Sequence, residues 1–176
     1  QAYDRNGNPI YNPIVIINIT PTSVIDTLDD SVYPPLPLSE TTAIADPLGS
    51  LIISEVTYHP VSDPNQPGFS SSDYEFVELY NTGSETLWLG DLSFTGGINL
   101  SFDADQELAS GSYGVVVANR DAFIARYGTG IHILAEFSKN LSDSGESIKI
   151  EDGGGRTITK VDYKDNDPWP IVADGL

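Results

Sequence analysis

The segment DYEFVELYN, residues 73–81, places carboxylates where they could take part in chemistry. Side chains alternate along a strand, so Glu75 lies on the same face as Val77 and Leu79. If that face covers the core, Glu75 points inward where the strand begins. We expect Glu55, on the preceding strand, to meet it there.

Two inward carboxylates repel each other unless a proton, a cluster of amides or a cation compensates. Calcium takes roughly six to eight oxygen ligands, and Asp73 with carbonyls of residues 59–72 can supply more of them. These residues predict a structural calcium site at Glu55, Asp73 and Glu75. The alternative is that the three acids lie at the rim of the sheet, in water or hydrogen-bonded to turn amides.

No catalytic residue stands out. The two histidines, His59 and His132, lie at a strand end and inside an apolar strand, as surface or core histidines do. The sequence has no G-x-S-x-G or H-E-x-x-H motif and no cysteine, which excludes thiolate zinc sites, disulfides and cysteine nucleophiles. We therefore expect no enzyme and no cofactor, with structural Ca²⁺ as the one candidate ion.

The two tryptophans are candidates for ligand stacking. Trp169 lies between two prolines and either closes one end of the core or offers a platform for a sugar ring. Together with Trp88 and an exposed tyrosine such as Tyr58 or Tyr113, it predicts an extracellular polysaccharide as an alternative ligand.

Almost all of the secondary structure expected around these residues is β-strand. Short β-branched and aromatic runs alternate with glycine-rich turns. We expect strands over residues 51–58, 74–81, 87–89, 92–94, 98–102, 113–118, 131–135, 147–151 and 157–163. The run YGVVVA, residues 113–118, is apolar throughout, which favours a central strand.

One segment, Asp121–Tyr127, has the composition of a helix. Asn119 or Asp121 can cap its start, and Gly128 suits a left-handed end. Many short strands with one short helix predict an all-β fold, an antiparallel β-sandwich.

Upstream of residue 51 the character changes. Residues 1–20 predict a β-hairpin, which is the end of a preceding β-domain or an added pair of edge strands. Residues 21–50 are rich in proline and predict a linker. The main domain is expected over residues 51–176.

The formal net charge is −18, with acids spread along the chain. Such a chain repels nucleic-acid phosphates and anionic lipid heads. No apolar run approaches the roughly 18 residues of a membrane span, so we expect neither nucleic acid nor membrane insertion. The chain has no methionine, and we expect it to be a piece of a longer protein.

Five motifs occur in a fixed order. They are ISEVTYHP (53–60), DYEFVELYNTGSETLWLGDLSF (73–94), ELASGSYGVVVANRDAFIARYG (107–128), NLSDSGESIKIEDGGGRTITKVDY (140–163) and DPWPIVADG (167–175). Residues 51–176 thereby resemble the lamin tail domain family, in its bacterial exported branch. The resemblance implies an immunoglobulin-like sandwich without enzymatic activity, in an extracellular or cell-surface protein.

Two departures from the family pattern matter. Phe94 stands near a position where the family often has tryptophan. The family also continues with one more strand, whereas this sequence stops at Leu176. Either a missing C-terminal segment or residues 11–20 would supply that strand.

The expected function is that of a non-catalytic structural or interaction module, spacing or docking other domains of its parent protein or binding a cell-surface protein. The alternative is a carbohydrate-binding module.

Overall fold

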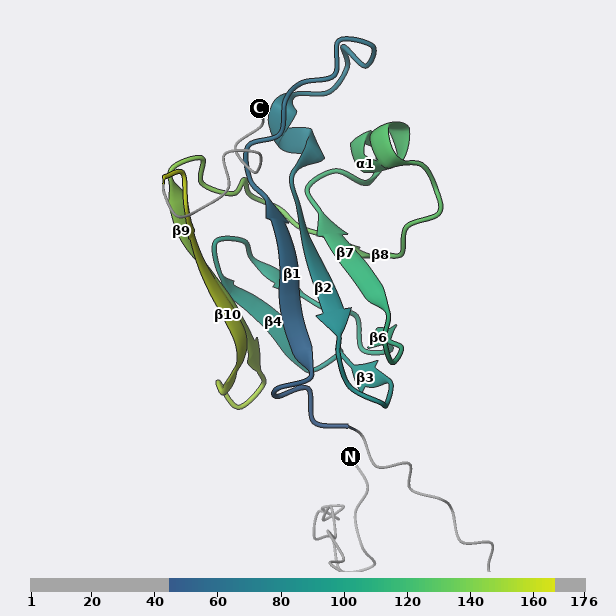
Figure 1. Ribbon diagram of the computed structural model, residues 1–176, viewed down its shortest axis with the longest axis vertical. Coiled ribbons are helices and arrows are strands. Elements are labelled where there is room, and N and C mark those ends of the chain that lie inside the picture. Colours follow the sequence, from purple (N-terminus) through teal and green to yellow (C-terminus); the bar gives the residue numbers. More distant parts are fainter. Residues whose placement is uncertain (1–44, 167–176) are drawn as a thin grey trace, which may run out of the picture. The chain divides into compact units, whose positions relative to one another are not determined.

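The computed structural model describes residues 45–166, which form an immunoglobulin-like β-sandwich with one α-helix (Figure 1). This confirms the fold class expected from the sequence. The elements are β1 (Leu51–Thr57), η1 (Ser71–Tyr74), β2 (Phe76–Asn81), β3 (Leu87–Trp88), β4 (Leu92–Gly96), β5 (Leu100–Ser101), β6 (Glu107–Leu108), β7 (Tyr113–Val117), α1 (Arg120–Tyr127), β8 (Ile133–Glu136), β9 (Gly145–Asp152) and β10 (Thr157–Lys164).

The first sheet has the strand order β1-β2-β7-β8. The apolar run of β7 lies between β2 and β8, as predicted for a central strand. β7 and β8 are parallel, unlike the antiparallel pairs on the other side of β7. A parallel pair needs a crossover connection, and α1 provides it.

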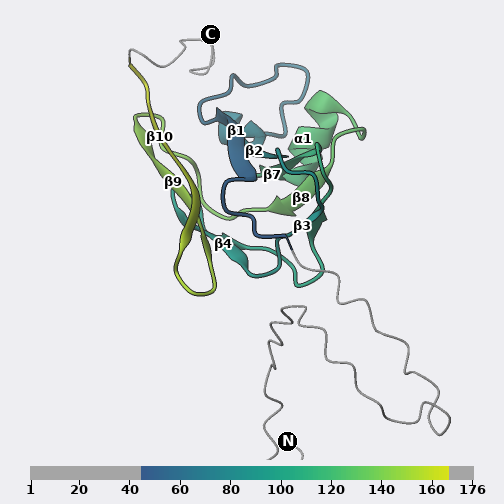
Figure 2. The same cartoon turned by 60° about the horizontal axis from the view of Figure 1, so that its bottom comes forward.

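The second sheet has the order β10-β9-β4-β5, and β3 pairs with β6 in a separate small ladder. Figure 2 shows β10, β9 and β4 as one layer and β1, β2, β7 and β8 as the other. β1 contacts β10, which brings the two layers together along one side.

The core lies between the two layers. The first sheet contributes Val77, Leu79 and Val116, and the second contributes Phe94 and Ile150 among others. Phe94 is 3% exposed and packs in this core. The alternation predicted for residues 75–80 is therefore confirmed, with Glu75, Val77 and Leu79 facing inward.

A smaller apolar cluster covers the outer face of the first sheet. Phe76, Val115 and Val117 pack there against Phe123 of α1. The rings of Phe76 and Phe123 are 5.4 Å apart, edge to face. Asn119 caps the helix by accepting the Ala122 N–H at 3.1 Å, and Gly128 ends it with φ of 84°. The predicted helix thus forms with the expected boundaries to within one residue.

Residues 45–50, which the sequence places in the linker, contact the sandwich. Ala45 forms an isolated β-bridge with Leu87, and Asp46 forms a salt bridge with Arg156. The predicted hairpin 1–20, the linker up to residue 44, the proposed pairing of residues 11–20 and the last motif with Trp169 lie outside the described residues. Within residues 45–166, no helix is long and apolar enough to cross a membrane.

Candidate functional site

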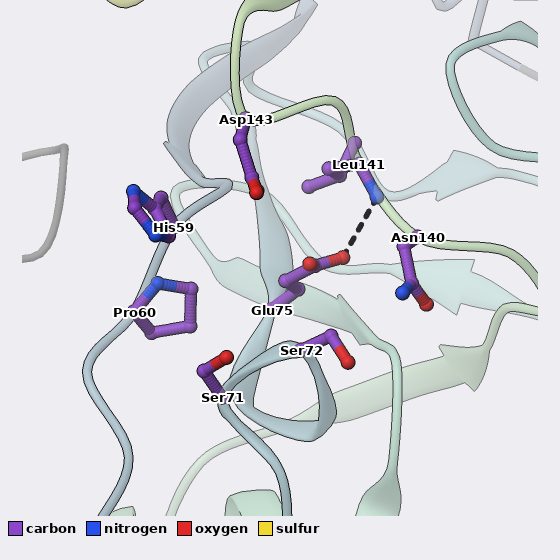
Figure 3. Close-up of a pocket in the computed structure, with 8 residues that line it drawn as sticks. All are labelled: His59, Pro60, Ser71, Ser72, Glu75, Asn140, Leu141 and Asp143. Carbon is purple, nitrogen blue, oxygen red and sulfur yellow. Dashed lines mark hydrogen bonds between the residues drawn. The ribbon is translucent and has the colours of Figure 1, made fainter.

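A polar pocket of about 280 Å³ lies at the end of the sandwich where β1 leaves and β2 begins. Its walls come from three segments that are far apart in the sequence: the exit of β1, the turn η1 and the loop before β9. They contribute His59, Pro60, Ser71, Ser72, Glu75, Asn140, Leu141 and Asp143. Figure 3 shows the carboxylates of Glu75 and Asp143 extending into the same space.

Glu75 is the inward carboxylate that strand periodicity predicted. It is 2% exposed, and one of its oxygens accepts the Leu141 N–H at 2.7 Å (Figure 3). Within residues 45–166, that amide is its one hydrogen-bond donor. Its second oxygen opens onto the pocket; among the described residues, the buried side-chain atom without a hydrogen-bond partner is the Tyr74 hydroxyl instead.

The electrostatics of Glu75 follow from this geometry. Burial raises the pKa of its carboxyl from 4.5 to about 7, against the opposing effect of the Leu141 hydrogen bond. The negative charges of Asp143 and Glu146 raise it further, and His59 lowers it. Glu75 is therefore partly protonated near neutral pH.

A second layer of hydrogen bonds fixes the loop that carries Asp143. Glu146 accepts the Ser142 N–H at 2.8 Å, and the Tyr163 hydroxyl lies 3.0 Å from the same oxygen and 2.9 Å from the Ser142 carbonyl. Burial and the charge of Glu146 raise the pKa of the Tyr163 hydroxyl, so it remains a proton donor. The far wall of the pocket is thus held by β9 and β10.

Glu55 does not take the predicted place beside Glu75. It is exposed, and its carboxylate accepts the Thr57 hydroxyl at 3.2 Å. The cause is a register shift in β1 between Ile53 and Glu55, which interrupts the alternation of faces. Ile53 and then Val56 pack against the core, which leaves Glu55 outside.

Asp73 is also used elsewhere. It precedes β2 in the turn η1, where its carboxylate accepts the backbone N–H and the hydroxyl of Ser70 at 2.7 and 2.6 Å. Asn119 donates to its other oxygen at 3.2 Å, which ties η1 to the start of α1. The Ser70 hydroxyl bond is the main cause that lowers the pKa of Asp73.

The predicted trio is therefore not brought together. Across residues 45–166, no three His, Cys, Asp or Glu side chains form a group able to hold a metal. The sequence found Glu75 but missed Asp143 and Asn140, because these residues come more than sixty positions later. The available signal is the run NLSD, residues 140–143, before a strand, and residues of these polar types are common in turns.

Of the residues considered for stacking, Trp88 is 37% exposed and lines a pocket of about 270 Å³. That pocket also contains Pro47, Asp91, Leu92, Asp152 and Arg156. Tyr113 is 53% exposed, as expected, whereas Tyr58 is buried in the core. Tyr58 is therefore not available for stacking.

The Arg156 side chain is fixed in place. Its guanidinium donates to both oxygens of Asp46 at 2.9 and 3.0 Å and through Nε to Asp152 at 2.9 Å. Of the two histidines, His59 lines the pocket at Glu75, and His132 is exposed beside β8 rather than inside an apolar strand.

A comparison with protein families matches residues 45–165 to the model of the Lamin Tail Domain. The chain belongs to the lamin tail domain family. Lamin tail domains are immunoglobulin-like domains without enzymatic activity, which agrees with the sandwich described above. No curated protein matches the chain.

Proposed function

We propose that this lamin tail domain is a non-catalytic interaction module that docks neighbouring domains of a larger exported protein. The observation that carries the proposal is a row of apolar side chains across β1, β2 and β7, exposed at both ends and half-buried at its centre. We call Ile52, Tyr80 and Tyr113 the tyrosine row.

The members of the tyrosine row are direct cross-strand neighbours on the outer face of the first sheet. Ile52 is opposite Tyr80, and Tyr80 is opposite Tyr113. The two tyrosine rings stack at 4.2 Å with 15° between their planes. Ile52 is 38% exposed and Tyr113 is 53% exposed.

An outward face of an antiparallel sheet is normally polar, so a row of this kind marks a binding surface. Tyrosine is enriched at the centres of interfaces, where it buries a large area at low entropic cost. Beside the row, the Ser54 hydroxyl donates to the Glu78 carboxylate at 2.8 Å, which supplies a polar, acidic rim. The complementary partner has an apolar centre and basic residues around it.

The test adds the 176-residue chain in trans to the other domains of its parent protein and measures binding by titration calorimetry. The double variant Tyr80→Thr, Tyr113→Thr is expected to bind more weakly, with a Kd at least about tenfold higher, since two interface aromatic rings are lost. Val61→Ser, which removes a 62% exposed apolar side chain from a loop, serves as the control. Absence of binding, or equal binding by the double variant, would refute the proposal.

The exported location is tested separately by treating intact cells of the source organism with protease. We expect the domain to be cleaved from the cell surface or found in the medium. Protection until the cells are lysed would contradict export.

A second function, carbohydrate binding, is favoured by the pocket at Trp88. An exposed indole beside Pro47 and Leu92 offers an apolar face for sugar C–H groups, and the carboxylate of Asp91 can accept hydroxyl hydrogen bonds. A glycan array with the native chain and with Trp88→Ala decides the question. Binding that is lost in Trp88→Ala supports this function, and no signal on the array excludes it for the glycans tested.

A further inference from the structure

The pocket at Glu75 is not explained by docking through the tyrosine row. Glu75 is 98% removed from solvent, yet one of its carboxylate oxygens has no hydrogen-bond donor among residues 45–166. That oxygen opens onto the pocket, where water or an ion can bind it. Here the space beside it is an open pocket of about 280 Å³ rather than packed side chains.

The pocket is lined with oxygen ligands. Asp143 extends its carboxylate toward Glu75, and Asn140, Ser71 and Ser72 place an amide and two hydroxyls around the same space (Figure 3). Lysine and arginine are absent from this lining, and its one nitrogen heterocycle is His59. Two carboxylates with neutral oxygens form a donor set that suits a hard divalent cation.

We propose that this pocket binds a calcium ion, with Glu75 and Asp143 as its charged ligands and with Asn140, Ser71 or Ser72 and water as neutral ligands. Calcium accepts mixed carboxylate, amide and water oxygens in a flexible geometry, so three acidic side chains are not required. Magnesium requires a tighter octahedral geometry and gives up its water molecules reluctantly, so we expect this pocket to bind it more weakly than calcium.

The ion would join the two layers of the sandwich. Glu75 directly precedes β2 of the first sheet, whereas Asn140 and Asp143 belong to the loop that leads into β9 of the second. That loop already contacts Glu75 through the Leu141 N–H. A bound cation therefore adds a second link at the same place and slows the separation of the sheets.

The experiment titrates calcium chloride into the 176-residue chain at pH 8 in about 0.1 M salt, which screens nonspecific attraction to the acidic surface. Two readouts are followed: the melting temperature and the NMR shift of the Leu141 amide. We expect saturable one-to-one binding and a rise in Tm of about 5 °C or more when calcium is a hundredfold above its Kd. Magnesium should produce a smaller rise.

Glu75→Gln and Asp143→Asn are expected to abolish the calcium response, while their matched controls Glu55→Gln and Asp103→Asn retain it. Each control removes one exposed charge outside the pocket. Glutamine at position 75 still accepts the Leu141 N–H, and Asp143 is exposed, so both variants should fold. No response up to about 10 mM calcium, above the weak affinities of extracellular modules, or an equal response in all four variants, would overturn the proposal.

Discussion

Two polar side chains are buried within the described part of the chain: Glu75, directly before β2, and Asn81, the last residue of β2. Asn81 is fully occupied: its amide donates to the carbonyls of Glu85 and Leu108 at 2.8 and 2.9 Å, and its oxygen accepts the Gly83 N–H at 2.9 Å. Glu75 has one donor and faces a pocket. The comparison separates a polar group that holds the fold from one that is left available for a ligand.

Substitution of Asn81 should lower the free energy of unfolding more than substitution of Glu75. Asn81→Ala removes three hydrogen bonds and leaves the buried Leu108 carbonyl, the Glu85 carbonyl and the Gly83 amide without a side-chain partner. We expect a loss of about 3 kcal/mol in the free energy of unfolding, measured by urea denaturation. Asn65→Ala, at an exposed asparagine, is the control and should cost less than about 0.5 kcal/mol. A loss below about 1 kcal/mol for Asn81→Ala would remove the distinction between the two residues.

Glu75 should respond to pH instead. The folded pKa of Glu75, about 7, lies above its ordinary value of 4.5, so the folded state holds the proton more tightly. This contribution to stability is fully present below pH 4.5 and is lost as the pH rises through 7. Without calcium, the loss between pH 4.5 and 8 should reach about 2 kcal/mol.

Glu75→Gln keeps the shape and cannot ionise, so its difference in stability from the native chain should grow over the same pH window. At pH 8 without calcium we expect the variant to be the more stable of the two. Urea unfolding at a series of pH values measures the difference. A difference that stays constant from pH 4.5 to 8 would show that Glu75 is not shifted.

Asp73 neighbours Glu75 in sequence but resembles Asn81 in its bonding, because both of its carboxylate oxygens accept hydrogen bonds. Asp73→Asn weakens the cap of η1 and should cost about 1 kcal/mol at pH 7. Since its folded pKa is lowered, that contribution is present above its ordinary value of 3.8 and lost as the pH falls. The calcium response should persist in this variant. Loss of the calcium response in Asp73→Asn would show that Asp73 takes part in calcium binding.

The tyrosine row lies near the Asn81 end and should matter least for folding. Tyr113→Thr removes one ring of a stacked cross-strand pair, which is worth roughly 0.2–1 kcal/mol. We expect a stability loss below about 1 kcal/mol, measured by thermal melting, together with weaker docking. A larger loss would assign the row to the fold rather than to a partner.

The alternation of side chains along a strand was enough to predict that Glu75 points inward. The alternation with Val77 and Leu79 predicted its inward direction correctly. The same reasoning failed for Glu55, because a bulge in β1 changes the face after Ile53, and bulges have weak sequence signals. It also failed for Asp73, because residues 71–74 form a 3₁₀ turn before the strand begins.

Contacts between segments far apart in the sequence could not be predicted from local patterns. The walls contributed by Asn140 and Asp143 depend on how the loop before β9 folds back over β2, which no local pattern specifies. The two-residue strand β6, Glu107–Leu108, was missed for the same reason, since its pairing with β3 is tertiary. Local chemistry did identify the Asn119 cap and the Gly128 end of α1, where the determinants are adjacent residues.

The most direct test is the titration of the Glu75 side-chain carboxyl by ¹³C NMR in the 176-residue chain, first with chelator and then with saturating calcium. We expect a midpoint near pH 7 without calcium, and a midpoint lower by about one pH unit or more with it. A midpoint near 4.5 that calcium leaves unchanged would contradict this expectation.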